Sequence, residues 1–382
     1  MTTHSHFRVS FGVRVWDSMN VYCPWILRVC AAPVWVWTIL RRTAYRRGWI
    51  SRHRLPQFVV SVGNVTIGGT GKTPFVIWLA HWLHEAGCKV AILSRGYGRN
   101  LSSEYLIVSD GQHLQTSWQL AGDEPFLIAQ KCPWAIVAVG KDRYELGRWV
   151  NARFDCDCFI LDDGFQHLHL HRDLDFVLLD ARDQEGIEGV VPAGRLRESL
   201  HSLRDATSLV LTRTEDTRPS ISLMKKLEAS LGSAVRPISV KFGLSSCWNL
   251  GNGIQQTMAM FQKQPVLVFS GIGNGQAFLD DLKALDIEVV EEMRFQDHFS
   301  YSAKDIDDIR KIMKAKHIPF ALTTEKDAVK IGEWVKSDDS IWAVTLDVQL
   351  GQGEDEITKL LSGFSVGGKG GNRIERLKEP VP

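Results

Sequence analysis

A glycine-rich loop ending in Gly-Lys-Thr constrains this chain more than any other feature of its 382 residues. The loop reads Gly-Gly-Thr-Gly-Lys-Thr-Pro at residues 68–74 and follows the apolar run at residues 58–62. Glycines allow successive backbone N–H groups to surround phosphate oxygens, and the N-terminus of a following helix adds a favourable dipole. A strand, such a loop and a helix in this order are typical of a P-loop nucleotide-binding domain.

The individual loop residues have separate expected roles. Lys72 would neutralise the β and γ phosphates of ATP, and the Thr73 hydroxyl would bind Mg²⁺. One position departs from the consensus, because Thr66 stands where the first glycine is usual. The alternative is a glycine-rich turn with a chance lysine. The residues expected to bind the nucleotide are Thr66, Ile67, Gly68, Gly69, Thr70, Gly71, Lys72 and Thr73.

A second apolar strand, at residues 159–161, ends in the two carboxylates Asp162 and Asp163. An acid at the end of a neighbouring strand is expected to complete the Mg²⁺ shell opposite Thr73. Adjacent side chains of an extended chain point to opposite sides, so we expect one Asp to meet the metal directly. The alternative is an ordinary turn, because Asp-Asp-Gly also favours turns.

Strand and helix patterns alternate from residue 57 onward, which implies a parallel sheet covered by helices on both faces. We therefore predict an α/β fold: a P-loop doubly wound, mostly parallel sheet with a second, smaller α/β domain and an N-terminal membrane-interface helix. Ligands of such sheets bind beyond the carboxyl ends of the strands. The expected strands are residues 58–62, 90–93, 135–139, 159–161, 176–179 and 208–211, then 266–269, 287–290, 320–323 and 341–344, and the expected helices include 74–86, 124–131 and 143–153.

Polar and aperiodic stretches predict the domain boundaries. A polar run at residues 212–222 suggests the end of the first domain, and the last residues contain Gly-Gly-Lys-Gly-Gly without periodicity. The predicted division is a head at 1–54, a P-loop domain at 55–211, a smaller α/β domain at 212–364 and a mobile tail at 365–382.

The net charge of +1 conceals a strongly basic head. Residues 1–60 contain nine Arg, no Lys and one acid, Asp17, whereas the rest of the chain carries 36 basic and 43 acidic side chains. Five of the 13 Trp lie in the first fifty residues. The nearly neutral total disfavours a protein built around nucleic acid. Arg and Trp together instead suit an anionic membrane interface, where guanidinium groups meet phosphates.

The most apolar stretch of the head, residues 21–40, does not predict a simple transmembrane helix. Arg28 interrupts it, Pro24 and Pro33 are expected to break its helix, and the uncharged part at residues 29–40 is shorter than the ~20 residues needed to span a bilayer. We expect peripheral attachment to the membrane. The alternatives are a cleaved signal peptide, a helix packed on the body, and a solvated basic arm.

With these motifs in view, the chain resembles the tetraacyldisaccharide 4'-kinases, the lipid A 4'-kinases. Asp-Asp-Gly-Phe-Gln-His beside Gly-Gly-Thr-Gly-Lys-Thr-Pro is the most specific part of the resemblance, which covers roughly residues 20–345. Further matching strings are Ser-Arg-Gly-Tyr-Gly-Arg at 94–99, Gly-Asp-Glu-Pro at 122–125, Asp-Arg at 142–143, Pro-Ala-Gly-Arg-Leu-Arg-Glu at 192–198, Asp-His at 297–298 and Thr-Glu-Lys-Asp-Ala-Val-Lys at 324–330.

The resemblance implies a kinase on the cytoplasmic face of the bacterial inner membrane that uses ATP and Mg²⁺. It would transfer the γ-phosphoryl group to the 4'-hydroxyl of tetraacyldisaccharide 1-phosphate, giving lipid IVA in lipid A biosynthesis. The family's motifs place the candidate base at Asp123 and an assisting histidine at His298, with Lys72 stabilising the transferred group. The substrate contacts that the resemblance implies are Arg95, Tyr97, Arg143, His167 and Arg195.

Three alternatives remain beside these roles. Asp123 precedes an apolar helical stretch and therefore also suits a helix N-cap. His167, His169 and His171 alternate with leucines, which would suit a metal site, but we interpret His167 as supporting the Asp pair and the other two as solvated. A membrane-recruited P-loop ATPase switch is the alternative function, although such switches usually carry an additional Lys that residues 63–65 lack.

Overall fold

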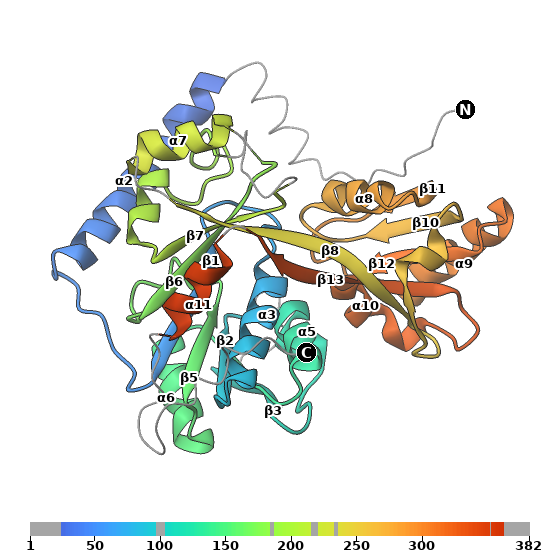
Figure 1. Cartoon of the computed structure of the whole chain (residues 1–382), viewed down its shortest axis with the longest axis horizontal. Coiled ribbons are helices and arrows are strands. Elements are labelled where there is room, and N and C mark those ends of the chain that lie inside the picture. Colours follow the sequence, from blue (N-terminus) through green and yellow to red (C-terminus); the bar gives the residue numbers. More distant parts are fainter. Residues whose placement is uncertain are drawn as a thin grey trace. The chain divides into compact units, whose positions relative to one another are not determined.

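The computed structural model describes residues 24–96, 104–183, 187–214, 221–232, 236–351 and 353–362. These residues form two compact units. The P-loop unit takes 24–241 together with 348–362, and the second unit takes 242–347. The long strand β8 (Ile238–Asn249) leads from the first unit into the second, and β13 (Ile341–Leu350) leads back (Figure 1). The expected tail at 365–382 lies outside the described residues.

The P-loop unit is built on a parallel sheet in which β3 alone is antiparallel to its neighbour. Its strand order is β8-β7-β6-β1-β5-β2-β4-β3. This arrangement confirms the predicted doubly wound, mostly parallel sheet. The strands before β8 are β1 (Phe58–Asn64), β2 (Val90–Ser94), β3 (Tyr105–Asp110), β4 (Ile136–Gly140), β5 (Cys158–Asp162), β6 (Leu174–Asp180) and β7 (Ser208–Thr212), and the helices are α2 (Pro24–Arg46), α3 (Lys72–Glu85), α4 (Trp118–Ala121), α5 (Asp123–Lys131), α6 (Arg143–Phe154), α7 (Ile221–Leu231) and α11 (Glu354–Ser362), with a 3₁₀ turn η1 (Leu200–Asp205).

The central strands are buried over almost their whole length, as parallel strands covered on both faces must be. Strand β1 pairs with β5 on one side and with β6 on the other. Because these strands are parallel, their carboxyl ends lie at the same edge of the sheet. The P-loop after β1, the Asp pair after β5 and Arg95 after β2 therefore gather at that edge.

The second unit is a smaller parallel sheet in the order β11-β10-β12-β13. Its apolar side chains form their own core, which includes Phe269, Ile306 and Ile309. The unit confirms a second α/β element set. Its other elements are β9 (Gln255–Thr257), η2 (Met258–Phe261), β10 (Pro265–Ser270), α8 (Gly275–Ala284), β11 (Glu288–Arg294), α9 (Ala303–Lys316), β12 (Phe320–Thr324), α10 (Glu325–Ile331) and η3 (Gly332–Trp334).

The division between the units falls later than the predicted boundary at residue 212. Helix α7 belongs to the P-loop unit because Leu223 and Leu227 are buried in one cluster with Leu209 and Leu211 of β7. The polar stretch therefore connects two elements of one unit. The sequence prediction also omitted β3, β8 and β9.

Residues Pro24–Arg46 of the head form one continuous helix, α2, so the expectation that Pro33 would break it is wrong. Proline removes one hydrogen bond and crowds the preceding turn. Pro33 lies on an exposed part of the helix, where water can satisfy the freed carbonyl. In the described part of the chain, no helix is long and apolar enough to span a membrane.

Candidate active site

The P-loop is held in place by hydrogen bonds with Asn64 and with the segment at residues 195–196. The Ile67 N–H donates to the carbonyl of Arg195 at 2.7 Å, and Thr66 forms an antiparallel bridge with Leu196. The Asn64 side chain donates to the Thr66 carbonyl at 2.8 Å. Gly71 has a φ of 85°, the left-handed conformation that favours glycine, and turns the loop into α3. Thr66 is thus compatible with the loop because its backbone pairs with a neighbouring strand-like segment.

Two carbonyl groups of the loop accept hydrogen bonds from outside it, whereas three of its N–H groups have no acceptor among the described residues. The Thr212 hydroxyl donates to the Thr70 carbonyl at 3.0 Å, and Arg213 donates to the Gly69 carbonyl at 2.8 Å. Within the described ranges, the N–H groups of Gly69, Thr70 and Gly71 meet no acceptor. Backbone donors concentrated at a helix N-terminus form an anion-binding site. The loop therefore has the geometry needed for phosphate.

The Asp pair packs tightly against β1 and faces the P-loop lysine. A Cβ on Gly164 would lie 2.6 Å from the Ser61 hydroxyl, so glycine is needed for this approach. Lys72 Nζ lies 3.6 Å from Asp163 Oδ1. Asp163 has a φ of 51°, a strained conformation for a residue with a side chain. Such strain is characteristic of functional sites, where the surrounding structure maintains it.

The two carboxylates differ in their ionisation. Burial, followed by the negative charges of Glu124 and Asp163, raises the pKa of Asp162 to about 7. Burial also acts to raise the pKa of Asp163, but Lys72 and the neighbouring arginines outweigh it and hold this pKa below its usual value. The buried Oδ1 atoms of both residues accept no hydrogen bond in the described structure. Carboxylate oxygens that accept no hydrogen bond are suited to a hard divalent cation such as Mg²⁺.

Asp123 is buried at the start of α5 with 6% of its surface exposed. Gly122 occupies the N-cap position, and Asp123 is the first helical residue. Its Oδ1 accepts the Glu124 N–H at 2.9 Å. Glu124, the next residue, is close enough to Asp162 to act on its pKa. The Asp123 carboxylate does not make the side-chain N-cap considered from the sequence.

Arg143 and Arg95 lie together beside the Asp pair. Arg143 is buried, and its Nη2 lies 3.5 Å from the Asp163 carbonyl. Its buried Nε has no hydrogen-bond partner in the described structure. Arg95 is exposed and close enough to Arg143 to act on its charge. Two adjacent cations at the edge of the sheet are chemically suited to a phosphate group. Tyr97, expected to contact substrate, lies outside the described residues.

Arg195 lies beside the P-loop, because its backbone carbonyl accepts a hydrogen bond from the Ile67 N–H. Its side chain is partly exposed and forms an ion pair with Asp183. Arg197, two residues later, donates its N–H to the Val65 carbonyl at 2.7 Å and pairs with Asp163 Oδ2 at 2.8 Å. Arg197 is not among the site residues predicted from the sequence, although it lies in the matching string at residues 192–198. A partner 34 residues away leaves no local signal in the sequence.

His167 does not contact the Asp pair, contrary to the interpretation from the sequence. Its Nε2 lies 3.9 Å from Asp142, the N-cap of α6. Burial, followed by the charge of Arg143, lowers the pKa of His167 to about 3. His169 also faces Asp142, and His171 instead faces Asp173 at 3.5 Å. The alternating pattern therefore brings two of the three histidines to one carboxylate.

His298 belongs to the second unit and is held there by its backbone and by Lys326. Its φ is 57°, and its N–H donates to the Gly271 carbonyl at 3.2 Å. Its Nε2 lies 3.3 Å from Lys326 Nζ. The Gly271 N–H in turn donates at 3.0 Å to Asp327, which is fully buried and forms an ion pair with Lys330. The Thr-Glu-Lys-Asp-Ala-Val-Lys string thus fixes the conformation of His298.

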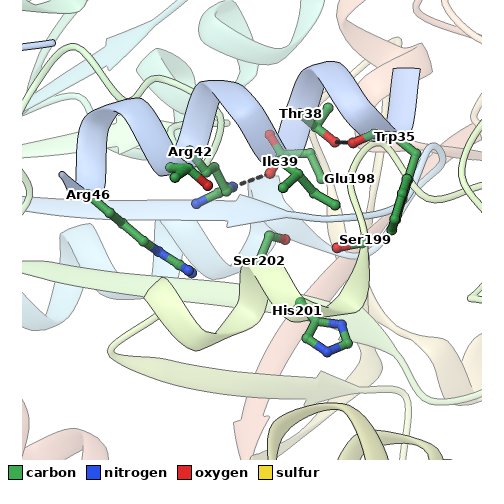
Figure 2. A pocket seen from close by; sticks show the side chains of 10 residues that line it. Trp35, Thr38, Ile39, Arg42, Arg46, Glu198, Ser199, His201 and Ser202 are labelled. Carbon is green, nitrogen blue, oxygen red and sulfur yellow. Dashed lines mark hydrogen bonds and ion pairs between the residues drawn. The ribbon is translucent and has the colours of Figure 1, made fainter. Parts of the chain in front are cut away.

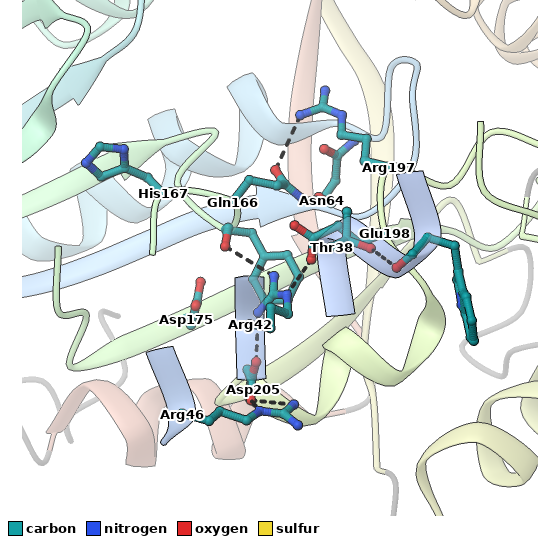
Figure 3. A network of polar contacts seen from close by, with 12 residues as sticks. Thr38, Arg42, Arg46, Asn64, Gln166, His167, Asp175, Arg197, Glu198 and Asp205 are labelled. Carbon is teal, nitrogen blue, oxygen red and sulfur yellow. Dashed lines mark hydrogen bonds and ion pairs between the residues drawn. The ribbon is translucent and has the colours of Figure 1, made fainter. Parts of the chain in front are cut away.

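Helix α2 is anchored to the P-loop unit through Arg42. The Arg42 guanidinium is buried, pairs with Glu198, and lies 2.8 Å from Asp205. Its carbon centre lies 4.2 Å from the centre of the Phe165 ring. Figure 3 shows Arg42 between the two carboxylates, with Arg46 on the outer side of Asp205. Because Phe165 and Glu198 belong to segments that contact the P-loop and the Asp pair, the head is connected to the site itself.

A groove of about 290 Å³ lies between α2 and the 3₁₀ turn η1 (Figure 2). Trp35 and Ile39 form part of its apolar lining, and Arg42 and Arg46 lie along it. Outside the groove, α2 exposes Trp25, Val29, Trp37 and Leu40 by 59–66% each. Exposed apolar patches of this kind mark interaction surfaces.

Similarity to known proteins identifies the family of this chain. A family model for tetraacyldisaccharide-1-P 4'-kinase matches residues 23–364. The chain belongs to the tetraacyldisaccharide 4'-kinase family. Tetraacyldisaccharide 4'-kinases from Geobacter sulfurreducens and Aquifex aeolicus are 35% and 36% identical to it, over 85% and 84% of this chain and 89% and 92% of theirs. The fold agrees with a crystal structure of LpxK from Aquifex aeolicus in complex with ATP, with a TM-score of 0.70 at 32% identity, over 91% of this chain and 99% of that one.

Membership of the tetraacyldisaccharide 4'-kinase family confirms the resemblance inferred from the motifs, and with it a kinase of lipid A biosynthesis that acts on a lipid disaccharide. The matched region includes α2 and both units, so the head belongs to the family's shared architecture.

Proposed function

We propose that this chain transfers the γ-phosphoryl group of ATP to the 4'-hydroxyl of tetraacyldisaccharide 1-phosphate through the site at the carboxyl edge of its P-loop sheet. The observation that carries this assignment is the approach of Lys72 to Asp163 beside a loop in which three consecutive N–H groups of the described structure are free to bind phosphate. A P-loop with its lysine and a strand-end Asp is the arrangement that binds a nucleoside triphosphate.

The nucleotide binds to residues Thr66 to Thr73, and Lys72 neutralises its β and γ phosphates. Thr73, Asp162 and Asp163 hold Mg²⁺, which neutralises charge on the phosphates when bound. The unsatisfied Oδ1 atoms of the two Asp residues support this ligand set. Most of the rate enhancement comes from positioned cations that stabilise charge on the transferred group.

The remaining polar residues act on the acceptor lipid. Asp123 accepts the proton of the sugar hydroxyl as the new bond to phosphorus forms, and His298 assists it. Arg95, Arg143 and Arg195 bind phosphate groups of the nucleotide or of the lipid, and His167 and Tyr97 contact the substrate. The buried, hydrogen-bonded position of Asp123 supports a fixed carboxylate.

Replacing Asp123 with asparagine tests the assignment of the base. The amide keeps the shape of the side chain but cannot accept the proton, so we expect turnover to fall about 10²–10⁴-fold. ATP affinity should be unchanged, because Asp123 is not part of the loop. Turnover would be followed by lipid product and ATP affinity by calorimetry, with Asp157→Asn at the opposite end of β5 as the matched control. Loss of ATP binding would reassign Asp123 to the nucleotide site.

The raised pKa of Asp162 predicts a pH-dependent response to Mg²⁺. With a folded pKa of about 7 and an unfolded pKa near the ordinary ~3.9, the metal-free folded state keeps a proton that the unfolded chain has lost. Asp162 should therefore lower the free energy of unfolding as pH rises from about 4 to about 7, with a slope approaching ~1.4 kcal/mol per pH unit. Its contribution should stay constant above about pH 7. Mg²⁺ binds the ionised carboxylate, so stabilisation by Mg²⁺ should increase across the same window.

Urea unfolding from pH 5 to 8, with and without Mg²⁺, measures this effect as the difference between the wild type and Asp162→Asn. The variant should lose both the pH slope due to this group and most of the stabilisation by Mg²⁺. Equal stabilisation of the two proteins by Mg²⁺ would place the metal elsewhere.

The head attaches the enzyme peripherally to an anionic membrane, on the cytoplasmic face of the inner membrane, rather than to nucleic acid. The exposed apolar residues of α2 support this placement, as do its exposed arginines. The groove between α2 and η1 lies beside this surface and offers space for part of an acyl chain.

Substituting two exposed residues of α2 tests the attachment without disturbing its anchor. The double variant Trp37→Ser/Leu40→Ser removes apolar surface whose burial in lipid would contribute several kcal/mol to membrane binding. Binding to phosphatidylglycerol–phosphatidylethanolamine vesicles should therefore weaken at least about tenfold. The control Ile254→Ser removes an exposed apolar residue of the second unit and should have no effect. Unchanged vesicle binding by the double variant would move the attachment to another surface.

A further inference from the structure

Three metal-ligating side chains gather at the start of α6, apart from the Asp pair. His169 Nδ1 lies 3.2 Å from Asp142 Oδ2, and His167 Nε2 lies 3.9 Å from Asp142 Oδ1. One ligand atom from each residue lies within 4.8 Å of the other two. None of the contacts drawn in Figure 3 reaches His167. The two histidines belong to the turn after β5, and Asp142 follows β4.

The chemistry of these groups is that of a ligand set. His167 Nε2 is buried and has no hydrogen-bond partner in the described structure. Its pKa of about 3 makes the imidazole neutral at pH 7, as a metal ligand must be. The N–H groups of Glu145 and Tyr144 hold the pKa of Asp142 below its usual value against the effect of burial, so this carboxylate is charged. Leaving a buried imidazole nitrogen without a hydrogen bond is unfavourable, and coordination of a metal ion would offset this loss of free energy.

Two imidazoles and one carboxylate favour zinc or a similar borderline metal over Mg²⁺, which prefers an all-oxygen shell. In a tetrahedral site with bonds of ~2.0 Å, ligand atoms are separated by roughly 3.3 Å. The separation of 3.2 Å between His169 and Asp142 already fits, and small side-chain rotations would bring His167 into place. All three residues are partly exposed, so a metal ion can enter and water can supply a fourth ligand.

We propose that Asp142, His167 and His169 form a second metal site that binds Zn²⁺ or a related transition-metal ion, separate from the Mg²⁺ site at Asp162 and Asp163. Arg143 and Arg172 act on His167 with their positive charge, which opposes a cation. The site therefore binds metal reversibly and is not a permanent structural centre. Because His167 is a proposed substrate contact, metal bound here withdraws its imidazole and inhibits the kinase; this consequence rests on the proposed function, whereas binding does not.

Cobalt titration tests the binding directly, because Co²⁺ is a visible stand-in for zinc. Nucleotide-free protein in excess Mg²⁺ should take up one Co²⁺ with an absorption band typical of nitrogen ligation, and Zn²⁺ should displace it. His169→Ala removes one ligand and should lower the affinity at least about tenfold. His171→Ala is the matched control, because this histidine faces Asp173 and should leave the affinity unchanged. His169→Gln and thermal unfolding of each variant verify that the loss is not one of folding.

The kinase assay gives an independent readout. Zn²⁺ at a concentration that fills the site should inhibit the wild type and His171→Ala but not His169→Ala, which keeps full activity without zinc. Absence of the cobalt band, or equal affinity in His169→Ala, would overturn the site. Zinc binding that depends on His169 without inhibition would uphold the site and overturn the substrate role of His167.

Discussion

Replacing Lys72 with alanine should lower the rate of 4'-phosphorylation by about 10³-fold, the loss expected when one fixed charge-stabilising donor is removed from an active site. Lys72 begins α3, and its ammonium group is partly buried 3.6 Å from Asp163. It is thus held at the site before the nucleotide arrives. Its charge matters most when negative charge develops on the transferred group, so the effect should appear mainly in kcat.

The lysine variant needs a control for general damage. Lys89 precedes β2 at the opposite edge of the same sheet, so Lys89→Ala should retain nearly full activity. Removal of Lys72 also leaves Asp163 without one of its cations, although Arg197 still pairs with it. Folding should therefore persist, which circular dichroism would verify. Activity within tenfold of the wild type in Lys72→Ala would contradict the proposed placement of the phosphates.

Replacing Arg42 with methionine should lower the free energy of unfolding by about 3–5 kcal/mol, the cost of leaving one partner of a buried ion pair without its counter-charge. Arg42 and Glu198 are each about 5% exposed, and Asp205 also loses a partner. The stacking of the guanidinium on Phe165 is lost as well. Urea unfolding at pH 7 would measure the change.

Arg46 is the matched control, because it pairs with the same Asp205 but its side chain is 46% exposed. Exposed ion pairs contribute about 0–1 kcal/mol, so Arg46→Met should change stability little. Glu198→Gln in the Arg42→Met background should restore part of the loss by removing the isolated charge. Equal effects of the two arginine substitutions would contradict the anchoring role of Arg42.

The sequence predicts those parts of the site that depend on contiguous residues. The P-loop and the Asp pair each form one short segment, and both follow apolar strands whose pairing in a parallel sheet brings their ends together. The alternation of strands and helices likewise predicts the fold class. Helix α3 begins at Lys72, within two residues of the expected start, because the loop and Pro74 determine its N-terminus.

Contacts between distant residues could not be predicted in this way. Arg42 lies 156 residues from Glu198 and 163 from Asp205, and nothing in the local pattern distinguishes it from the other arginines of the head. Pro33 was expected to end a helix because the local rule does not account for tertiary anchoring by Leu27, Ala31 and Arg42. The described part of the head, from residue 24 onward, therefore belongs to the P-loop unit.

The histidine pattern illustrates the same limit at shorter range. Alternation correctly brings His167 and His169 to a common partner, but the turn after the Asp pair directs His171 to Asp173. Asp142 comes from a different strand end, so the ligand set could be recognised only in the fold.

The stoichiometry of the reaction tests the central claim most directly. Purified protein would be incubated with ATP, Mg²⁺ and tetraacyldisaccharide 1-phosphate in detergent, and ADP and phosphorylated lipid would be quantified together. We predict one lipid 4'-phosphate for each ADP, with little ADP formed without the acceptor. ADP formed without phosphorylated lipid would indicate an ATPase switch, and phosphate at another position of the disaccharide would contradict the proposed acceptor; either result would overturn the account.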